Sequence, residues 1–255
     1  MEGYSASTYG DRFADIYDDW YGDVTDADAC ADRLTELVAE AGGGPILEMG
    51  VGSGRLALPL VARGLTVHGI DASASMVDRL RAKPDGDRVH VTVGDMAELD
   101  LPSPPAFAVV LVAFNTFFNL GSEDDQRRCL DRVAASLAPG GRFVLEAFVP
   151  TDPPDSEGRF EGSVVPRRIG ADEVVLAVTS TDHVAQTISG SHVHLTERGI
   201  RLRPWHLRYA TPAQLDELAE NAGLVLDWRR GGWRDEPFTA DSSVHVSAYR
   251  LGSPR

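Results

Sequence analysis

The stretch ILEMGVGSG at residues 46–54 joins a short apolar run to three closely spaced glycines. Apolar residues 45–49 predict a buried strand, and apolar residues then recur at helical spacing over residues 54–63. Glycines between a strand and a helix let the backbone turn sharply and let a ligand approach without a Cβ in the way. The stretch therefore predicts a strand, a turn and a helix, with a ligand at the turn.

Further strands and helices alternate along the chain after this unit. We expect strands at residues 65–70, 88–93, 107–114 and 142–148, and helices at residues 73–81 and 122–137, the second ending at a Pro139–Gly140–Gly141 turn. Strands that alternate with helices at this spacing predict a parallel, doubly wound sheet. The fourth strand is apolar on both faces, as a central parallel strand should be.

The pattern changes after the fifth strand. Residues 150–158 are rich in proline, aspartate, serine and glycine and read as a linker. Residues 160–208 alternate polar and apolar in short stretches without a helical period, which predicts a small antiparallel sheet. We therefore expect residues 155–208 to form an inserted β subdomain over the substrate site.

The chain then returns to the first sheet. A helix begins at Thr211, a good cap, with Pro212 at its first position. Two apolar runs, at residues 224–228 and 244–250, would close the sheet as a late antiparallel pair. Residues 1–154 and 209–255 are thus expected to form one domain.

Two carboxylates follow the second and third expected strands. Asp71 is placed to accept hydrogen bonds from both hydroxyls of a ribose, and Asp95 can receive an adenine amino group. A glycine turn or a carboxylate cap is common by itself, but three such features at successive strand ends indicate a nucleotide site. The dinucleotide fingerprint G-x-G-x-x-G would need a third glycine where Arg55 stands, which disfavours NAD.

Together these segments resemble the class I S-adenosylmethionine-dependent methyltransferases. The matching stretches come in the family's order: ILEMGVGSG (46–54), VHGIDAS (67–73), VGDM (93–96), VVLVAFNTFFNL (109–120) and LAPGGRFVLEAF (137–148). The resemblance implies an α/β fold with a Rossmann-like, doubly wound seven-stranded sheet, and S-adenosyl-L-methionine as the cofactor. The opening TYGDRFADIYDDWYG (8–22) also resembles the N-terminal helical lid of small-molecule members, such as sugar and natural-product N- or O-methyltransferases.

The resemblance also implies which residues bind the cofactor. Glu48 and the glycines would line its methionine end, Asp71 would hold the ribose, and Phe114 would flank the sulfonium. The full expected set is Tyr9, Tyr17, Trp20, Glu48, Gly50, Gly52, Gly54, Arg55, Asp71, Ala72, Met76, Asp95, Met96 and Phe114. The lid aromatics suit the task because aromatic faces attract a sulfonium cation, although such residues are equally common in the core of an amphipathic helix.

The substrate side is less defined by sequence. Methyl transfer depends mainly on aligning the reacting atoms; a neutral amine needs no base, whereas a hydroxyl does. Candidate residues are Asn115, Asn119, Glu146, His206 and Arg208. His206 has a suitable pKa for a base, and strand alternation puts Arg208 on the same face, where it could orient a polar substrate. Relatives that methylate amino sugars carry a histidine at the position of Asn119, so this departure puts the same route in doubt.

Composition limits the partners. The formal net charge of −15 over 255 residues disfavours a nucleic-acid partner. The only cysteines, Cys30 and Cys129, suit a reducing compartment and give no zinc ligand set, and the histidine spacing supports no metal site. No apolar run approaches the roughly 20 residues of a membrane span. We therefore expect a cytoplasmic protein, a monomer or homodimer, acting on a small-molecule methyl acceptor.

Two other functions remain open at this point. One is an NAD(P)-dependent oxidoreductase, and the other is a non-catalytic regulatory protein that binds a cofactor on the same fold, because fold does not imply function. The glycine turn with Asp71 disfavours the second.

Overall fold

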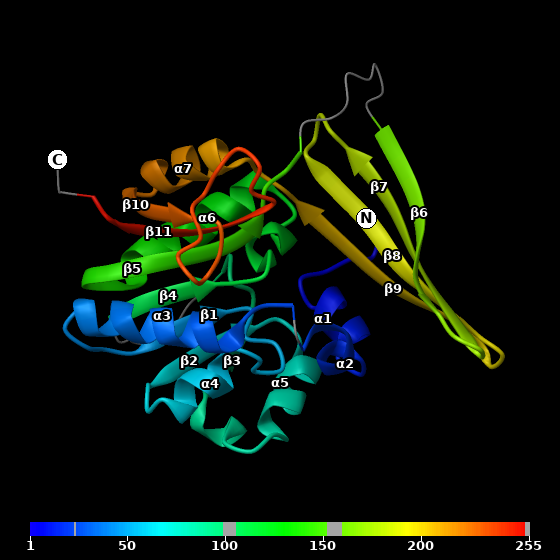
Figure 1. Cartoon of the computed structure of the whole chain (residues 1–255), viewed down its shortest axis with the longest axis horizontal. Coiled ribbons are helices and arrows are strands. Elements are labelled where there is room, and N and C mark those ends of the chain that lie inside the picture. Colours follow the sequence, from blue (N-terminus) through cyan, green and yellow to red (C-terminus); the bar gives the residue numbers. More distant parts are fainter. Residues whose placement is uncertain (23, 99–105, 152–159, 253–255) are drawn as a thin grey trace.

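The computed structural model of the chain describes residues 1–22, 24–98, 106–151 and 160–252 (Figure 1). Its main feature is a seven-stranded sheet in the order β10-β11-β5-β4-β1-β2-β3. The strands are β1 (Ile46–Met49), β2 (Val67–Asp71), β3 (His90–Val93), β4 (Phe107–Val112), β5 (Leu137–Phe148), β10 (Leu224–Arg230) and β11 (Val244–Leu251). The first five pair in parallel, and β11 runs antiparallel to both β5 and β10, so the predicted doubly wound sheet and its late antiparallel pair are confirmed.

Helices cover both faces of this sheet. They are α3 (Ala27–Glu40), α4 (Ala57–Ala62), α5 (Ala74–Arg81), α6 (Glu123–Ser136) and α7 (Pro212–Asn221), with short 3₁₀ turns η1 (Gly86–Arg88) and η2 (Thr116–Asn119). One core cluster joins α6 and α7 to the sheet, and the other joins α3 and α4 to its opposite face. The central strands β1 and β4 are buried along their whole length, because helices cover both of their faces.

The carboxyl end of the parallel sheet is covered by two short helices. These are α1 (Thr8–Phe13) and α2 (Tyr17–Tyr21), and we call residues 8–21 the lid. Phe13 and Tyr21 are buried in a cluster with Met76 of α5, and Phe114 and Trp205 pack against it. In Figure 1 the lid lies between the parallel sheet and a second sheet. The predicted N-terminal helical lid is therefore confirmed.

The second sheet has four antiparallel strands in sequence order, and we call it the outer sheet. It consists of β6 (Phe160–Ile169), β7 (Glu173–Asp182), β8 (Thr187–Thr196) and β9 (Gly199–Arg208). This confirms the antiparallel pattern expected between the fifth strand and α7. The chain re-enters the main sheet through α7, where the Thr211 side chain accepts from the N–H of Gln214 in a capping box. The expected domain boundary at residues 154 and 155 lies outside the described residues.

One expected turn is wrong. Helix α6 ends at Ser136, and the chain is already extended from Leu137 rather than turning at Pro139–Gly140–Gly141. Leu137 pairs with Phe107 of β4, and the register then shifts before Val109 pairs with Arg142. The glycines therefore sit inside an irregular strand, where Gly140 takes a positive φ of 80°. Pairing with a distant strand overrides the local turn signal here.

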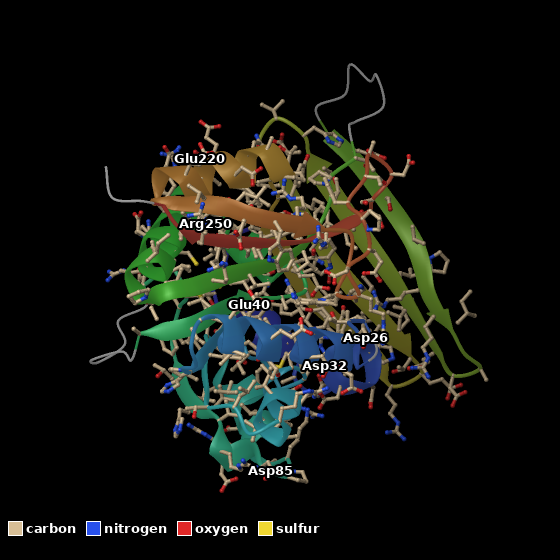
Figure 2. The ribbon with its side chains drawn as sticks, turned by 60° about the vertical axis from the view of Figure 1, so that its left-hand side comes forward. Asp26, Asp32, Glu40, Asp85, Glu220 and Arg250 are labelled. Carbon is tan, nitrogen blue, oxygen red and sulfur yellow. The ribbon has the colours of Figure 1, made fainter. Side chains whose placement is uncertain are left out.

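Acidic side chains are spread over the surface. Figure 2 labels Asp32, Glu40 and Asp85, whose side chains are 68%, 57% and 56% exposed. Such a surface repels a phosphate backbone. Within the described ranges, no helix is long and apolar enough to cross a membrane.

Candidate functional site

A cavity of about 410 Å³ lies at the carboxyl ends of the parallel strands, beneath the lid. Eleven of the residues expected from the sequence line it: Tyr9, Tyr17, Gly50, Gly52, Asp71, Ala72, Met76, Asp95, Met96, Asn119 and His206. They come from the lid, from the ends of β1, β2 and β3, from α5, and from η2 and β9. In doubly wound sheets, ligands bind at this edge, where the strand order reverses.

The glycine turn after β1 is bonded directly to the end of β2. The backbone N–H of Gly52 donates to Oδ2 of Asp71 at 2.8 Å, and the N–H of Ser73 donates to Oδ1 at 2.8 Å. Gly50 has a φ of 75°, and a Cβ there would lie 2.3 Å from Cγ2 of Thr116. Burial raises the pKa of Asp71, although these two N–H groups act in the opposite direction. Each carboxylate oxygen retains a lone pair toward the cavity for a ribose hydroxyl.

The neighbouring part of the cavity suits a flat aromatic ring. Ala72 and the side chain of Met76 line it from the β2 end, and Met96 lines it from the β3 end. Asp95 accepts the N–H of Ala97 on Oδ1 at 2.9 Å, which fixes the carboxylate and leaves acceptor capacity for an amino group. These four residues are where an adenine would lie if Asp71 holds its ribose.

Two ionisable side chains on either side of the glycine turn in the sequence, Glu48 and Arg55, have buried atoms without partners among the residues described. Glu48 is only 4% exposed, and its Oε2 has no hydrogen-bond partner within the described part of the chain. Burial raises the pKa of Glu48 to about 8, opposed by Arg55 and reinforced by Asp71. Nε and Nη1 of Arg55 are likewise buried without partners among the residues described. An unpaired acceptor beside unpaired donors matches the ammonium and carboxylate of an amino acid, although neither side chain lines the cavity itself.

Three other expected cofactor residues lie outside the cavity lining. Gly54 serves packing, because a Cβ there would lie 2.1 Å from Cδ1 of Leu80. Trp20 stacks edge-on against Phe13 and His192 in the lid cluster. The Phe114 ring lies beneath the Arg55 guanidinium, 5.3 Å from its carbon to the ring centroid.

The turn after β4 is strained and is held by a buried carboxylate. Phe114 and Asn115 have φ angles of 48° and 63°, which side chains other than glycine rarely adopt. Oε2 of Glu146 accepts the Phe114 N–H at 2.9 Å, and Oδ1 of Asn115 accepts the Phe148 N–H at 2.6 Å. Glu146 also accepts from Nε1 of Trp233 at 2.9 Å. Asn115 and Glu146, expected on the substrate side, thus position the turn rather than line the cavity.

His206 and Asn119 also line the cavity, from β9 and η2. Nδ1 of His206 lies 2.9 Å from Oγ of Ser189, so the ring is held in place, and its Nε2 edge faces Gly121. Burial lowers the pKa of His206, and the positive N-terminus adds to the effect. A neutral imidazole with one nitrogen held and the other directed toward the cavity is suited to accept a proton.

Arg208 does not line the cavity. Its guanidinium donates to Oε1 of Gln126 at 2.6 Å and to Oε2 of Glu123 at 2.6 Å, both on α6. Nε2 of Gln126 in turn donates to the Arg208 carbonyl at 2.8 Å. Arg208 therefore fixes the end of β9 to α6 and has no contact with the site.

Several lining residues are not foreseen from the sequence: Tyr4, Ser5, Ala6, Gly10, Thr116, Ser122 and Asp125. Only Gly10 carries a signal, because a glycine inside a helix weakens it unless close packing requires it. A Cβ at Gly10 would lie 2.4 Å from Cβ of Ser73, so the lid packs directly on the start of α5. Across the described ranges, no three His, Cys, Asp or Glu side chains are grouped to hold a metal.

Comparisons with known proteins agree with this geometry. Residues 46–141 match the methyltransferase domain family. The CcbJ methyltransferase from Streptomyces caelestis is 38% identical, with a TM-score of 0.88 over 98% of this chain and 100% of that one. The cypemycin N-terminal methyltransferase of a Streptomyces species is 29% identical over 78% of this chain and 80% of its own length.

A more distant structure shares the fold. This is CalS10 with S-adenosylmethionine bound, an amino pentose methyltransferase from Micromonospora echinaspora involved in calicheamicin biosynthesis. It is 22% identical, with a TM-score of 0.64 over 91% of this chain and 96% of that one. With 38% identity across the whole of one methyltransferase and a methyltransferase domain around the glycine turn, the chain belongs to the class I S-adenosylmethionine-dependent methyltransferases of the small-molecule type.

Proposed function

We propose that this enzyme binds S-adenosyl-L-methionine in the cavity and methylates a nitrogen atom of a small secondary metabolite or sugar. The observation that carries the proposal is one cavity whose lining includes both Asp71 and Asp95 and, from η2 and β9, Asn119 and His206. Two relatives support nitrogen over oxygen as the atom that receives the methyl group. One is named the cypemycin N-terminal methyltransferase, and the other, CalS10, is named an amino pentose methyltransferase.

The residues present fit the cofactor. Asp71 would hold the ribose hydroxyls, and Asp95, Met76, Met96 and Ala72 would surround the adenine. The unpaired Oε2 of Glu48 would take the ammonium, and the unpaired donors of Arg55 would take the carboxylate. Tyr9 and Tyr17 would cover the ligand from the lid and exclude water. When bound, the cofactor supplies an electrophilic methyl group on a good leaving group.

The chain's own contribution is then positioning and proton transfer. Asn119 can accept a hydrogen bond from the acceptor amine through Oδ1 and so orient its lone pair toward the methyl end. Nδ1 of His206 lies 2.9 Å from Oγ of Ser189, and in the tautomer in which Nδ1–H donates to that oxygen, Nε2 would act as the base. It would take the proton of an ammonium form of the acceptor and keep the amine neutral and nucleophilic.

The proposal also covers the compartment, the domain organisation and the oligomeric state of the enzyme. Both cysteines are free and buried, which suits the cytoplasm. We also propose that the outer sheet is a subdomain inserted over the substrate side, and that the enzyme is a monomer or homodimer.

Calorimetry with S-adenosylmethionine, S-adenosylhomocysteine and NAD tests the first step. We expect the first two to bind and NAD to be ignored. Formation of S-adenosylhomocysteine is then followed over a panel of amino sugars, amino-acid amides and short peptides, each paired with its hydroxyl analogue. Turnover with amines alone supports nitrogen; turnover with hydroxyl analogues alone, or binding of NAD in place of both adenosyl ligands, contradicts the proposal.

A further inference from the structure

Three acidic residues of the lid are each bonded to a different part of the molecule. Oδ1 of Asp11 accepts from Oγ of Ser73 at the start of α5 at 2.6 Å. Asp15 is paired with Arg203 of β9, whose side chain is only 2% exposed, so the lid is fixed to the outer sheet. Asp18 faces the opposite way, toward the glycine turn and α5.

Asp18, Ser53 and Lys83 form a closed triangle of hydrogen bonds. Oγ of Ser53, inside the glycine turn, donates to Oδ1 of Asp18 at 2.5 Å. Nζ of Lys83 donates to the same oxygen at 2.8 Å and to the Ser53 carbonyl at 2.8 Å. Each corner is bonded to the other two, so the lid and the glycine turn are joined both directly and through Lys83. Lys83 is also the only lysine in the sequence.

The triangle carries a charge arrangement that favours closure. The Asp18 side chain is 31% exposed and Lys83 29%, and Arg79 of α5 adds a second cation at 3.3 Å. Burial would raise the pKa of Asp18, but the bonds from Lys83 and Ser53 outweigh it and the pKa lies below its usual value. Charge-assisted bonds of this kind are stronger than neutral ones.

We propose that Asp18 and Lys83 are positioning residues that form a latch, coupling the cofactor-binding glycine turn to closure of the lid. Tyr17, next to Asp18, lines the cavity, and Gly52, next to Ser53, is bonded to Asp71. A ligand that orders the glycine turn therefore also orders the surface that Asp18 contacts. The inference rests on the proposed function only for the identity of that ligand.

The latch has a matched control in the same helix. Asp19 is exposed and takes no part in the three bonds of the triangle, so Asp19→Asn removes the same charge without removing any of them. Asp18→Asn and Lys83→Met remove the two ends of the ion pair separately. Circular dichroism and thermal melting first establish that each variant folds.

The first measurement needs no ligand. Amide hydrogen exchange of residues 8–21 reports opening of the lid, and we expect it to be about tenfold faster in Asp18→Asn and Lys83→Met than in Asp19→Asn. The double variant should show less than the product of the two single effects, since both substitutions remove the Asp18–Lys83 contact. Equal exchange in Asp18→Asn and Asp19→Asn overturns the latch, whatever the enzyme binds.

The second measurement uses S-adenosylhomocysteine and follows its dissociation by stopped-flow tryptophan fluorescence. We expect dissociation to be about tenfold faster from the two latch variants and within about twofold of wild type for Asp19→Asn. Wild-type dissociation rates in both latch variants contradict the coupling. Failure of the wild type to bind either adenosyl ligand instead contradicts the proposed function, and the ligand-free exchange still decides on the latch.

Discussion

The cavity is lined by two groups of residues that are built in different ways. Around Asp71, the functional groups lie at the ends of neighbouring parallel strands, and backbone N–H groups of Gly52 and Ser73 hold the carboxylate. His206, in contrast, comes from the outer sheet, and its neighbour is a side chain, Ser189 of the adjacent strand. The position of Asp71 is determined by the topology of the main sheet, whereas that of His206 depends on how a separate sheet is packed against it.

We expect substitutions at His206 to affect the chemical step and substitutions at Asp71 to affect the affinity for the cofactor. His206→Gln should lower kcat by about 10²- to 10⁴-fold, the usual contribution of a general base, with the affinity for S-adenosylhomocysteine unchanged. The acceptor is any amine that the wild-type enzyme methylates, and rates are measured across the pH range. Ser189→Ala should show a smaller loss, because the ring stays but is no longer held. An unchanged kcat in His206→Gln would leave positioning as the main source of rate.

In the other group, Asp71→Ala should weaken binding of S-adenosylmethionine by about 1.5–3 kcal/mol, or roughly 10- to 150-fold, because charge-assisted bonds to the ribose are lost. Calorimetry measures this directly. Asp78→Ala is a matched control, since Asp78 is an exposed acid on the adjacent helix α5. If the two variants bind the ligand equally well, Asp71 does not hold the ribose.

How well the structure could be predicted from the sequence also differs between the residues around Asp71 and the regions that depend on packing. The alternation of strands and helices and the convergence of Asp71 and Asp95 are consequences of local pattern and parallel topology. The turn at residues 139–141 was expected wrongly because Leu137 pairs with Phe107, some 30 positions away. Membership in the methyltransferase family also decides against an oxidoreductase and a non-catalytic protein.

Side-chain partners in the packed regions were the least predictable. Trp20 and Phe114 are aromatic residues next to the site, yet contacts to His192 and Arg55 determine where their rings lie. No sequence pattern reports such pairings, because each joins segments that are distant along the chain. The same is true of the triangle around Lys83.

A smaller effect concerns protonation of Glu48. Its pKa of about 8 in the fold keeps it mostly protonated at pH 7, whereas an ammonium partner favours its ionised form. Binding of S-adenosylmethionine should therefore release a proton below pH 8, and affinity should rise about tenfold between pH 6 and pH 7. Calorimetry in buffers of different ionisation enthalpy measures the proton release, and Glu48→Gln should abolish it.

The stability of the ligand-free enzyme should depend on pH in the opposite direction from the affinity for the ligand. The folded state holds this proton up to about pH 8, whereas the unfolded chain loses it near the ordinary value of 4.5. The free energy of unfolding of the ligand-free enzyme should therefore fall as pH rises through this window, and Glu48→Gln should fall less. Identical pH profiles for the two proteins would show that Glu48 is ionised in the fold.

The smallest expected effect is at Arg208, and it tests whether this residue belongs to the site. It shares a strand face with His206, but its guanidinium is bonded to Glu123 and Gln126 of α6. Because Glu123 is 42% exposed, solvent screens the ion pair, and Arg208→Met should cost only about 0.5–1 kcal/mol of stability. We expect kcat within about twofold of wild type, since removing an interaction outside the cavity leaves the transition state unchanged. Glu123→Gln should lower the melting temperature as well, and the double variant should lose less than the sum of the two single losses, because both substitutions remove the Arg208–Glu123 contact. A loss of kcat in Arg208→Met that Glu123→Gln does not reproduce would mean that Arg208 leaves α6 and orients the substrate during turnover.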